Sequence, residues 1–197
     1  MATVHECKIH ILRPTQITVG LIEVSDKCIH LASMKKRDRR AFLSEHSIPA
    51  VLGPRDRLYL TDHHHLALAA WHMKVESAFF VVEANWSKFG IKKFWREMIK
   101  NQWAHPIDWR GEKRPIDEIP SHVHGLCDDI YRSLASYVRN AGGYEKTPTA
   151  FAEFQWAEFF RERIVIGSTR ADFDRAVQQA CQLAQSPKAR ELPGYRG

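Results

Sequence analysis

The feature that most constrains the fold is the stretch RLYLTDHHHLALAAW, in which two apolar runs are joined by only a few polar residues. Residues 57–61 are typical of a short strand, and residues 65–73 carry apolar side chains at helical spacing. A strand that turns at once into a helix implies a chain that combines a sheet with helices. The four residues at the junction, Asp62 and three consecutive histidines, are therefore the first candidates for a functional site.

The rest of the first half of the chain fits this arrangement. Gly53-Pro54 separates two short strands that can form a hairpin. A helical stripe begins at Thr18 and continues into the basic segment that ends at Arg40. Strands are predicted over residues 4–12, 48–53, 57–61 and 78–86.

Beyond residue 90 the pattern becomes helical. Phe94 and Met98 recur at helical spacing, which predicts an amphipathic helix, and Thr169 stands three residues before Asp172, as in a capping box. Further helices are expected over residues 127–140, 149–164 and 170–185. The fold class is α+β: a small mixed-sheet domain over 1–103, a helical part over 104–186 and a loose tail over 187–197.

Composition narrows the class of protein. No stretch approaches the roughly 18 uninterrupted apolar residues of a membrane span, and MATVHECKIH lacks the apolar core of a signal peptide, so a cytosolic protein without a membrane partner is expected. The four cysteines form no CxxC pair, which argues against a disulfide framework and a structural zinc site. The net charge of +6 is compatible with phosphate-bearing partners, although the basic runs at 35–40 and 88–100 are more typical of solvated helix faces.

The histidine run is first interpreted as a phosphate site. Backbone amides of residues 63–65 at the start of a helix point outward without partners in the helix, and the helix dipole favours an anion there. Neighbouring imidazoles can donate hydrogen bonds to phosphate oxygens or transfer protons near neutral pH.

Two other interpretations stay open. A metal would need Asp62 or one histidine with a distant ligand such as His5, His10 or His105, because consecutive helical residues point about 100° apart. In the simplest interpretation, Asp62 is the N-cap and the histidines form a polar first turn.

Three segments, ILRPTQITVG, VLGPRDRLYLTDHHHLALAAW and GGYEKTPTAFAEFQWAEFFRERI, together resemble the ParB-like putative nuclease family over nearly the whole chain. The N-terminal part is similar to a superfamily that includes the partitioning protein ParB, sulfiredoxins and an ADP-dependent free serine kinase. The resemblance implies a small mixed sheet with helices, whose strand-to-helix turn holds nucleotide phosphates. By similarity that turn is Asp62–His65, with His63, His64 and His65 as phosphate or nucleotide ligands.

The resemblance also suggests catalytic roles. His64 stands where sulfiredoxins have their cysteine and is the candidate general acid/base or transient phosphoryl acceptor; His65 is a second candidate, and Asp62 would orient an imidazole or hold Mg²⁺. The turn lacks a cysteine, which excludes the sulfiredoxin reaction, and Leu66 replaces an arginine that would clamp phosphate. Upstream, Thr15 and Gln16 lie in a loop similar to the one that borders the nucleotide pocket.

The C-terminal motif supplies the last candidates. Lys146, after a Gly-Gly turn, could reach a phosphate, whereas Glu153, Glu158 and Arg161 are most simply a solvated helix face. The expected function is that of an enzyme acting on a phosphoester, a nucleotide or a phosphorylated small molecule, with Mg²⁺ or another divalent metal as cofactor. The alternative is a non-enzymatic nucleic-acid-binding or regulatory module.

Overall fold

A mixed five-stranded sheet organises the first part of the chain, in the order β1-β6-β4-β5-β2. In this computed structural model, which describes residues 3–197, β1 pairs antiparallel with β6, β6 parallel with β4, β4 antiparallel with β5, and β5 parallel with β2. A second, two-stranded sheet joins β3 and β7 in parallel. The strands are β1 (Val4–Lys8), β2 (Leu12–Arg13), β3 (Thr18–Val19), β4 (Ile48–Gly53), β5 (Arg57–Leu60), β6 (Ser77–Asn85) and β7 (Cys127–Asp128).

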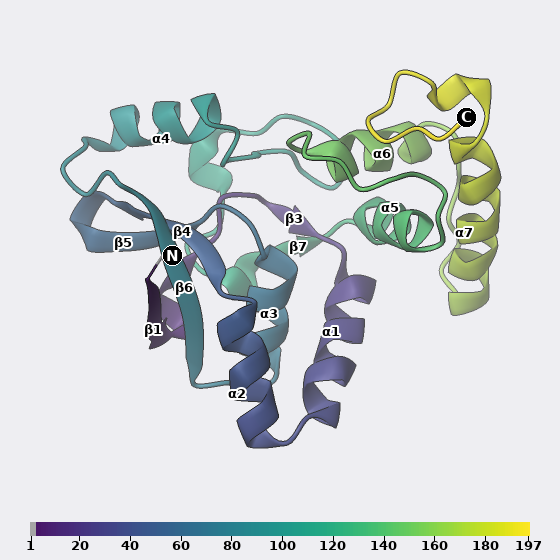
Figure 1. The fold of residues 1–197 in the computed structure, drawn as a ribbon. Coiled ribbons are helices and arrows are strands. Elements are labelled where there is room, and N and C mark those ends of the chain that lie inside the picture. The colour runs from purple at the N-terminus through teal and green to yellow at the C-terminus, as the bar shows by residue number, and fades with distance from the viewer. Residues whose placement is uncertain (1–2) are drawn as a thin grey trace. The chain divides into compact units, whose positions relative to one another are not determined.

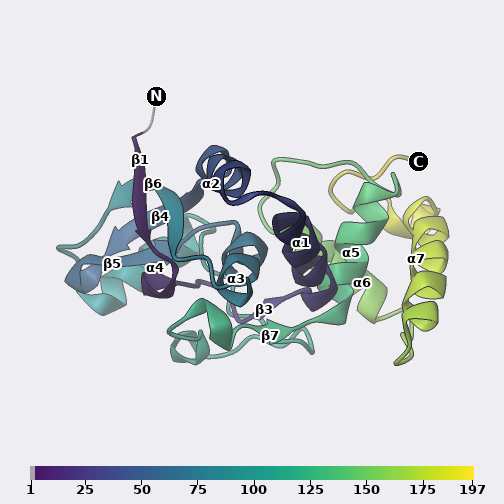
Figure 2. The same cartoon turned by 90° about the horizontal axis from the view of Figure 1, so that it is seen from below.

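Helices cover both faces of the large sheet (Figure 1, Figure 2). The side chains of β5 alternate: Leu58 and Leu60 belong to the core shared with α1, α2 and α3, whereas Tyr59 packs on Phe94 of α4 with ring centroids 4.5 Å apart. This two-sided burial explains why β5 reads as a continuous apolar run. The four helices are α1 (Leu21–Ser33), α2 (Lys36–Glu45), α3 (His64–His72) and α4 (Ile91–Lys100).

The chain divides into two compact units, the first ending at Asp128 and the second running from Asp129 to Gly197. In the second unit Trp156, Phe160 and Phe173 are fully buried, and the Tyr144 ring stacks on Trp156. The capping box predicted at Thr169 and Asp172 is present. The helices of this unit are α5 (Ile130–Asn140), α6 (Ala152–Arg161) and α7 (Arg170–Ala184).

The α+β class, the β4–β5 hairpin and the helices after residue 90 are confirmed. Single-turn 3-10 helices complete the secondary structure, at Ile9–Ile11, Pro54–Asp56, Ile116–Glu118, Val123–Gly125 and Pro187–Ala189. In the part of the chain that the structure describes, no helix has the length and apolar character needed to cross a bilayer.

Two elements that the sequence predicts to be continuous are each divided in the structure. The single strand over 4–12 is two strands, because a 3-10 turn at Ile9–Ile11 lets β1 pair with β6 while β2 pairs with β5 at the opposite edge of the sheet. The single helix from Thr18 to Arg40 begins instead with β3 and breaks at Met34 and Lys35, which are both extended. The break allows α2 to turn back and bury Leu43 in the same core.

The domain limits also differ from the expected ones. The compact units separate between residues 128 and 129, not after residue 103. The tail over 187–197, expected to be loose, makes specific contacts: the Trp156 indole Nε1 donates to the Pro193 carbonyl, and the Glu145 amide donates to the Gly194 carbonyl. Ala189 is fully buried.

Candidate functional site

The turn between β5 and α3 has a tight, specific backbone. The strand ends at Leu60, the helix begins at His64, and His63 is the N-cap in a left-handed conformation (φ 61°, ψ 27°). The simplest interpretation of the sequence, in which Asp62 is the N-cap, is therefore wrong. The Asp62 carboxylate Oδ1 instead accepts a hydrogen bond from the His63 amide at 2.6 Å. Non-glycine residues rarely adopt this conformation, and such residues are concentrated at functional sites.

His64 is buried and holds the preceding loop against the turn. Its ring nitrogen Nε2 accepts a hydrogen bond from the Thr15 amide at 3.1 Å and lies 3.3 Å from Thr15 Oγ1, which donates to the Leu60 carbonyl at 2.6 Å. An amide can only donate, so Nε2 must keep its lone pair, and the neutral ring carries its proton on Nδ1. In this arrangement His64 holds the loop in place by accepting the Thr15 amide at Nε2.

His65 makes the equivalent contact at the start of α1. Its Nε2 accepts the Gly20 amide at 3.0 Å and lies 3.4 Å from Glu23 Oε2. The next amide of the same helix start, that of Leu21, donates to Asp128 Oδ1 at 2.8 Å. Two consecutive imidazoles of α3 thus fix the two ends of the segment from Thr15 to Gly20.

The loop candidates are brought to this turn in different ways. Thr15 is 1% exposed and contacts His64 directly. Gln16 is also buried; its backbone forms an isolated parallel bridge with His105, whose amide donates to the Thr15 carbonyl at 2.8 Å. Lys146 is exposed and belongs to the second unit.

His63 and Asp62 are the more accessible polar side chains of the turn. Asp62 is exposed and His63 is half-buried. The His63 ring atom Nδ1 is shielded from solvent yet has no hydrogen-bond partner among residues 3–197. A shielded imidazole nitrogen without a partner is unfavourable unless something else satisfies it.

A metal set of protein side chains is not assembled here. Among the residues that the structure describes, no three His, Cys, Asp or Glu side chains are grouped closely enough to hold an ion. Of the distant ligands considered from the sequence, His5 stacks on Phe80 with centroids 5.4 Å apart, and the His10 carbonyl accepts from His122 Nδ1.

A polar face of α5 was missed in the sequence. Asp129, at the N-cap, is buried and accepts a bidentate pair from Arg161 at 2.8 and 3.1 Å, while Glu153 pairs with Arg132 at 3.7 Å and also with Arg139. Glu158 pairs with Arg161 at 3.0 Å. Helical spacing of polar residues was the available signal, because one face carries Asp129, Arg132, Ser133 and Ser136.

The chain is similar to a known protein family and to a protein of known structure. Residues 5–162 match the model of a family described as putative ParB-like nuclease. The crystal structure of protein Atu1540 from Agrobacterium tumefaciens is similar over 100% of this chain and 98% of that chain, with 41% sequence identity and a TM-score of 0.91. No curated protein matches.

Proposed function

The chain belongs to the family of putative ParB-like nucleases, and from this premise we propose that the Asp62–His65 turn binds the phosphate group of a phosphoester or nucleotide. The observation that carries the proposal is the geometry of His63. This residue is the N-cap of α3 and has a left-handed conformation, and its Nδ1 is shielded and without a partner among the described residues. A phosphate oxygen at the helix start would interact with the helix dipole, and it would satisfy that nitrogen once the His63 ring turns to expose Nδ1.

The three imidazoles then have separate roles. His63 and the first-turn amides contact the phosphate, whereas His64 and His65 hold the segment from Thr15 to Gly20 beside the turn through their Nε2 atoms. Such pre-positioning reduces the ordering that a ligand would otherwise have to impose.

The chemistry that fits is hydrolysis of a phosphoester. Water attacks phosphorus and forms a new P–O bond, the ester P–O bond breaks, and an imidazole accepts the proton of water or donates one to the leaving oxygen. His63 is better suited to this transfer than His64, whose Nε2 is engaged by Thr15. Asp62 would supply the single carboxylate with which Mg²⁺ commonly joins substrate phosphates.

Isothermal titration with ADP and ATP, with and without Mg²⁺, tests the binding. His63→Ala should weaken nucleotide binding about tenfold, an effect of the size expected for losing one charge-assisted contact. His64→Gln, which keeps an acceptor for the Thr15 amide, should bind within about threefold of wild type. His30→Ala, which alters an exposed histidine in the last turn of α1, is the matched control. Unchanged binding in His63→Ala would contradict the proposal.

Turnover separates His63 from His64 as the proton-transfer group. If nucleotide or bis-p-nitrophenyl phosphate is hydrolysed, His64→Gln should retain most of the rate, because glutamine preserves the loop contact. Since glutamine cannot transfer a proton, a retained rate would mean that His64 is not the proton-transfer group. Normal binding with lost turnover in His64→Gln would instead assign proton transfer to His64, the role suggested by its place in the turn.

A further inference from the structure

A positively charged groove lies at the opposite end of α3 from the histidine turn. It begins in a cavity of about 320 Å³ between α2 and the segment Lys74–Ser77. Four of the nine lining residues are cationic, Lys36, Arg39, Arg40 and Lys74, and only Glu76 is acidic. This excess of positive charge around a concave apolar floor of Leu43, Val75 and Phe79 favours an anionic occupant.

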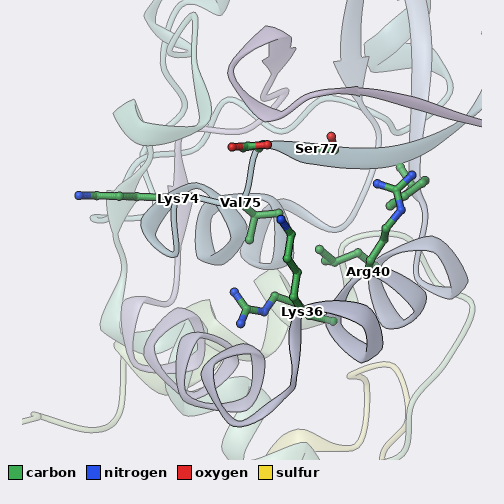
Figure 3. A pocket seen from close by; sticks show the side chains of 9 residues that line it. Lys36, Arg40, Lys74, Val75 and Ser77 are labelled. Carbon is green, nitrogen blue, oxygen red and sulfur yellow. The ribbon is translucent and has the colours of Figure 1, made fainter.

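The cations of the groove do not all serve the same purpose. Arg40 forms a bidentate pair with Glu6 at 2.7 and 2.8 Å and lies over the Phe79 ring, so it mainly builds the wall. Lys36 extends from α2 toward the segment 74–77, and Lys74 points away from Arg40 (Figure 3). Arg39 donates one Nη2 bond to the Met34 carbonyl, and its Nε has no hydrogen-bond partner among residues 3–197. Lys36, Arg39 and Lys74 are therefore the cations left for a ligand.

The end of α3 sets the position of Lys74. Lys74 has φ 53°, a left-handed conformation in which glycine or asparagine is the usual residue. The position is fixed by the Lys74 amide, which donates to the Trp71 carbonyl, and by the Val75 amide, which donates to Ala70. This is a left-handed ending of the kind with which many helices stop, and it fixes the backbone from which the Lys74 side chain extends.

A second cavity has lining residues in common with the first. This cavity of about 910 Å³ shares the wall Lys74–Ser77 and is lined on its far side by Lys8, His10, Trp71 and His72. Trp71 is 36% exposed, with His72 at its edge and His124 stacked on it at 5.1 Å. The cations of the first cavity and the aromatic rings at the second are therefore separated only by the shared segment Lys74–Ser77.

We propose that this groove binds a single strand of nucleic acid, with backbone phosphates on Lys36, Arg39 and Lys74 and a base against Trp71 and His72. Cations that follow a backbone, combined with aromatic rings on which bases stack, are the pattern by which proteins hold single strands. Two cavities that have four lining residues in common suit an extended strand better than one isolated phosphate. The groove lies about 13 Å, the length of the nine-residue α3, from the turn, so the inference is independent of the proposed function.

Fluorescence anisotropy with labelled single-stranded dT and rU oligomers across a salt series tests the groove. The double variant Lys36→Ala/Lys74→Asn should weaken binding about tenfold and reduce the salt slope by about 1.4, since each phosphate contact on a single strand contributes about 0.7. Asparagine is chosen because it tolerates the left-handed backbone. The charge-matched control Lys92→Ala/Lys100→Asn alters exposed residues of α4 and should bind as wild type does.

Two further variants sharpen the test. Glu76→Gln removes the acidic lining residue and should tighten binding, while His72→Ala should weaken binding about fivefold with no change in salt slope, because stacking does not release counterions. A preference for dT or rU would identify the type of strand. Equal loss in the α4 control, wild-type binding by the groove double variant, or tighter binding of a duplex than of either strand would overturn the assignment.

Discussion

The Thr15 amide donates to Nε2 of His64 over 3.1 Å, and the two residues are 1% and 4% exposed although 49 positions separate them in the chain. The contact joins the loop after β2 to the first turn of α3. It also requires the lone pair of Nε2, which constrains what His64 can do chemically.

Replacing His64 should therefore lower the stability of the fold more than it affects ligand binding. In His64→Ala the Thr15 amide is left buried without its acceptor, and we expect the free energy of unfolding to fall by about 2 kcal/mol. His64→Gln should recover part of this loss, because its side-chain oxygen can accept the same amide. Urea denaturation measures both, with His72→Ala expected to differ from wild type by less than about 0.5 kcal/mol. Equal stability of His64→Ala and wild type would show that the contact contributes nothing.

The pair of Glu6 and Arg40 predicts a specific acid sensitivity. Hydrogen bonds from Arg40 and Ser77 lower the pKa of Glu6 from 4.5 to about 2 in the folded protein. Because the folded pKa is depressed, the stabilisation by Glu6 is present above pH 4.5 and is lost as the pH falls toward 2.

Chemical denaturation of wild type and Glu6→Gln between pH 2 and pH 7 isolates this contribution from that of other carboxyl groups. The two unfolding free energies should converge as the pH falls below about 4.5 and differ most near neutrality. A difference that does not change with pH would contradict the depressed pKa.

Cysteine reactivity should follow burial. Burial, aided by the nearby negative charge of Glu6, raises the pKa of the Cys7 thiol to about 11, whereas Cys127 is exposed. Since the thiolate is the reactive form, iodoacetamide at pH 8 should modify Cys127 well before Cys7. Peptide mass spectrometry over time gives the order, and early labelling of Cys7 would mean that β1 opens readily from the sheet edge.

The second unit should depend on the pair of Asp129 and Arg161. The Asp129 carboxylate is buried, caps α5 by accepting the Tyr131 amide, and receives two hydrogen bonds from Arg161. Arg161→Leu leaves that carboxylate buried without its guanidinium, and we expect a loss of about 3 kcal/mol in the free energy of unfolding. Arg196→Leu, whose pair with Glu145 is exposed, is the control and should change little by the same denaturation measurement.

Local patterns predicted much of this fold, and partners distant in the chain account for what they missed. The β5-to-α3 junction follows from periodicity within fifteen residues, as does the capping box at Thr169. The split of residues 4–12 does not, because β1 and β2 pair with strands at opposite edges of the sheet. Strand pairing depends on such tertiary context more than on local composition.

In the candidate site, too, local patterns identify some features and contacts between residues distant in the chain determine the others. The histidine run was identified from its position at a helix start, but the acceptor roles of His64 and His65 depend on Thr15 and Gly20, more than forty residues earlier. The sequence predicts a solvated helix face for the basic run at 35–40, since nothing local indicates that Lys36 and Arg39 line a cavity with Lys74.

The most direct test of the central claim is a titration of the ¹⁵N-labelled protein with inorganic pyrophosphate, followed by amide chemical shifts. If the turn is a phosphate site, the largest shifts should fall on the amides of residues 63–66, and His63→Ala should reduce them. Shifts confined to residues 36–40 and 72–77, with the turn unaffected, would contradict the phosphate site at Asp62–His65.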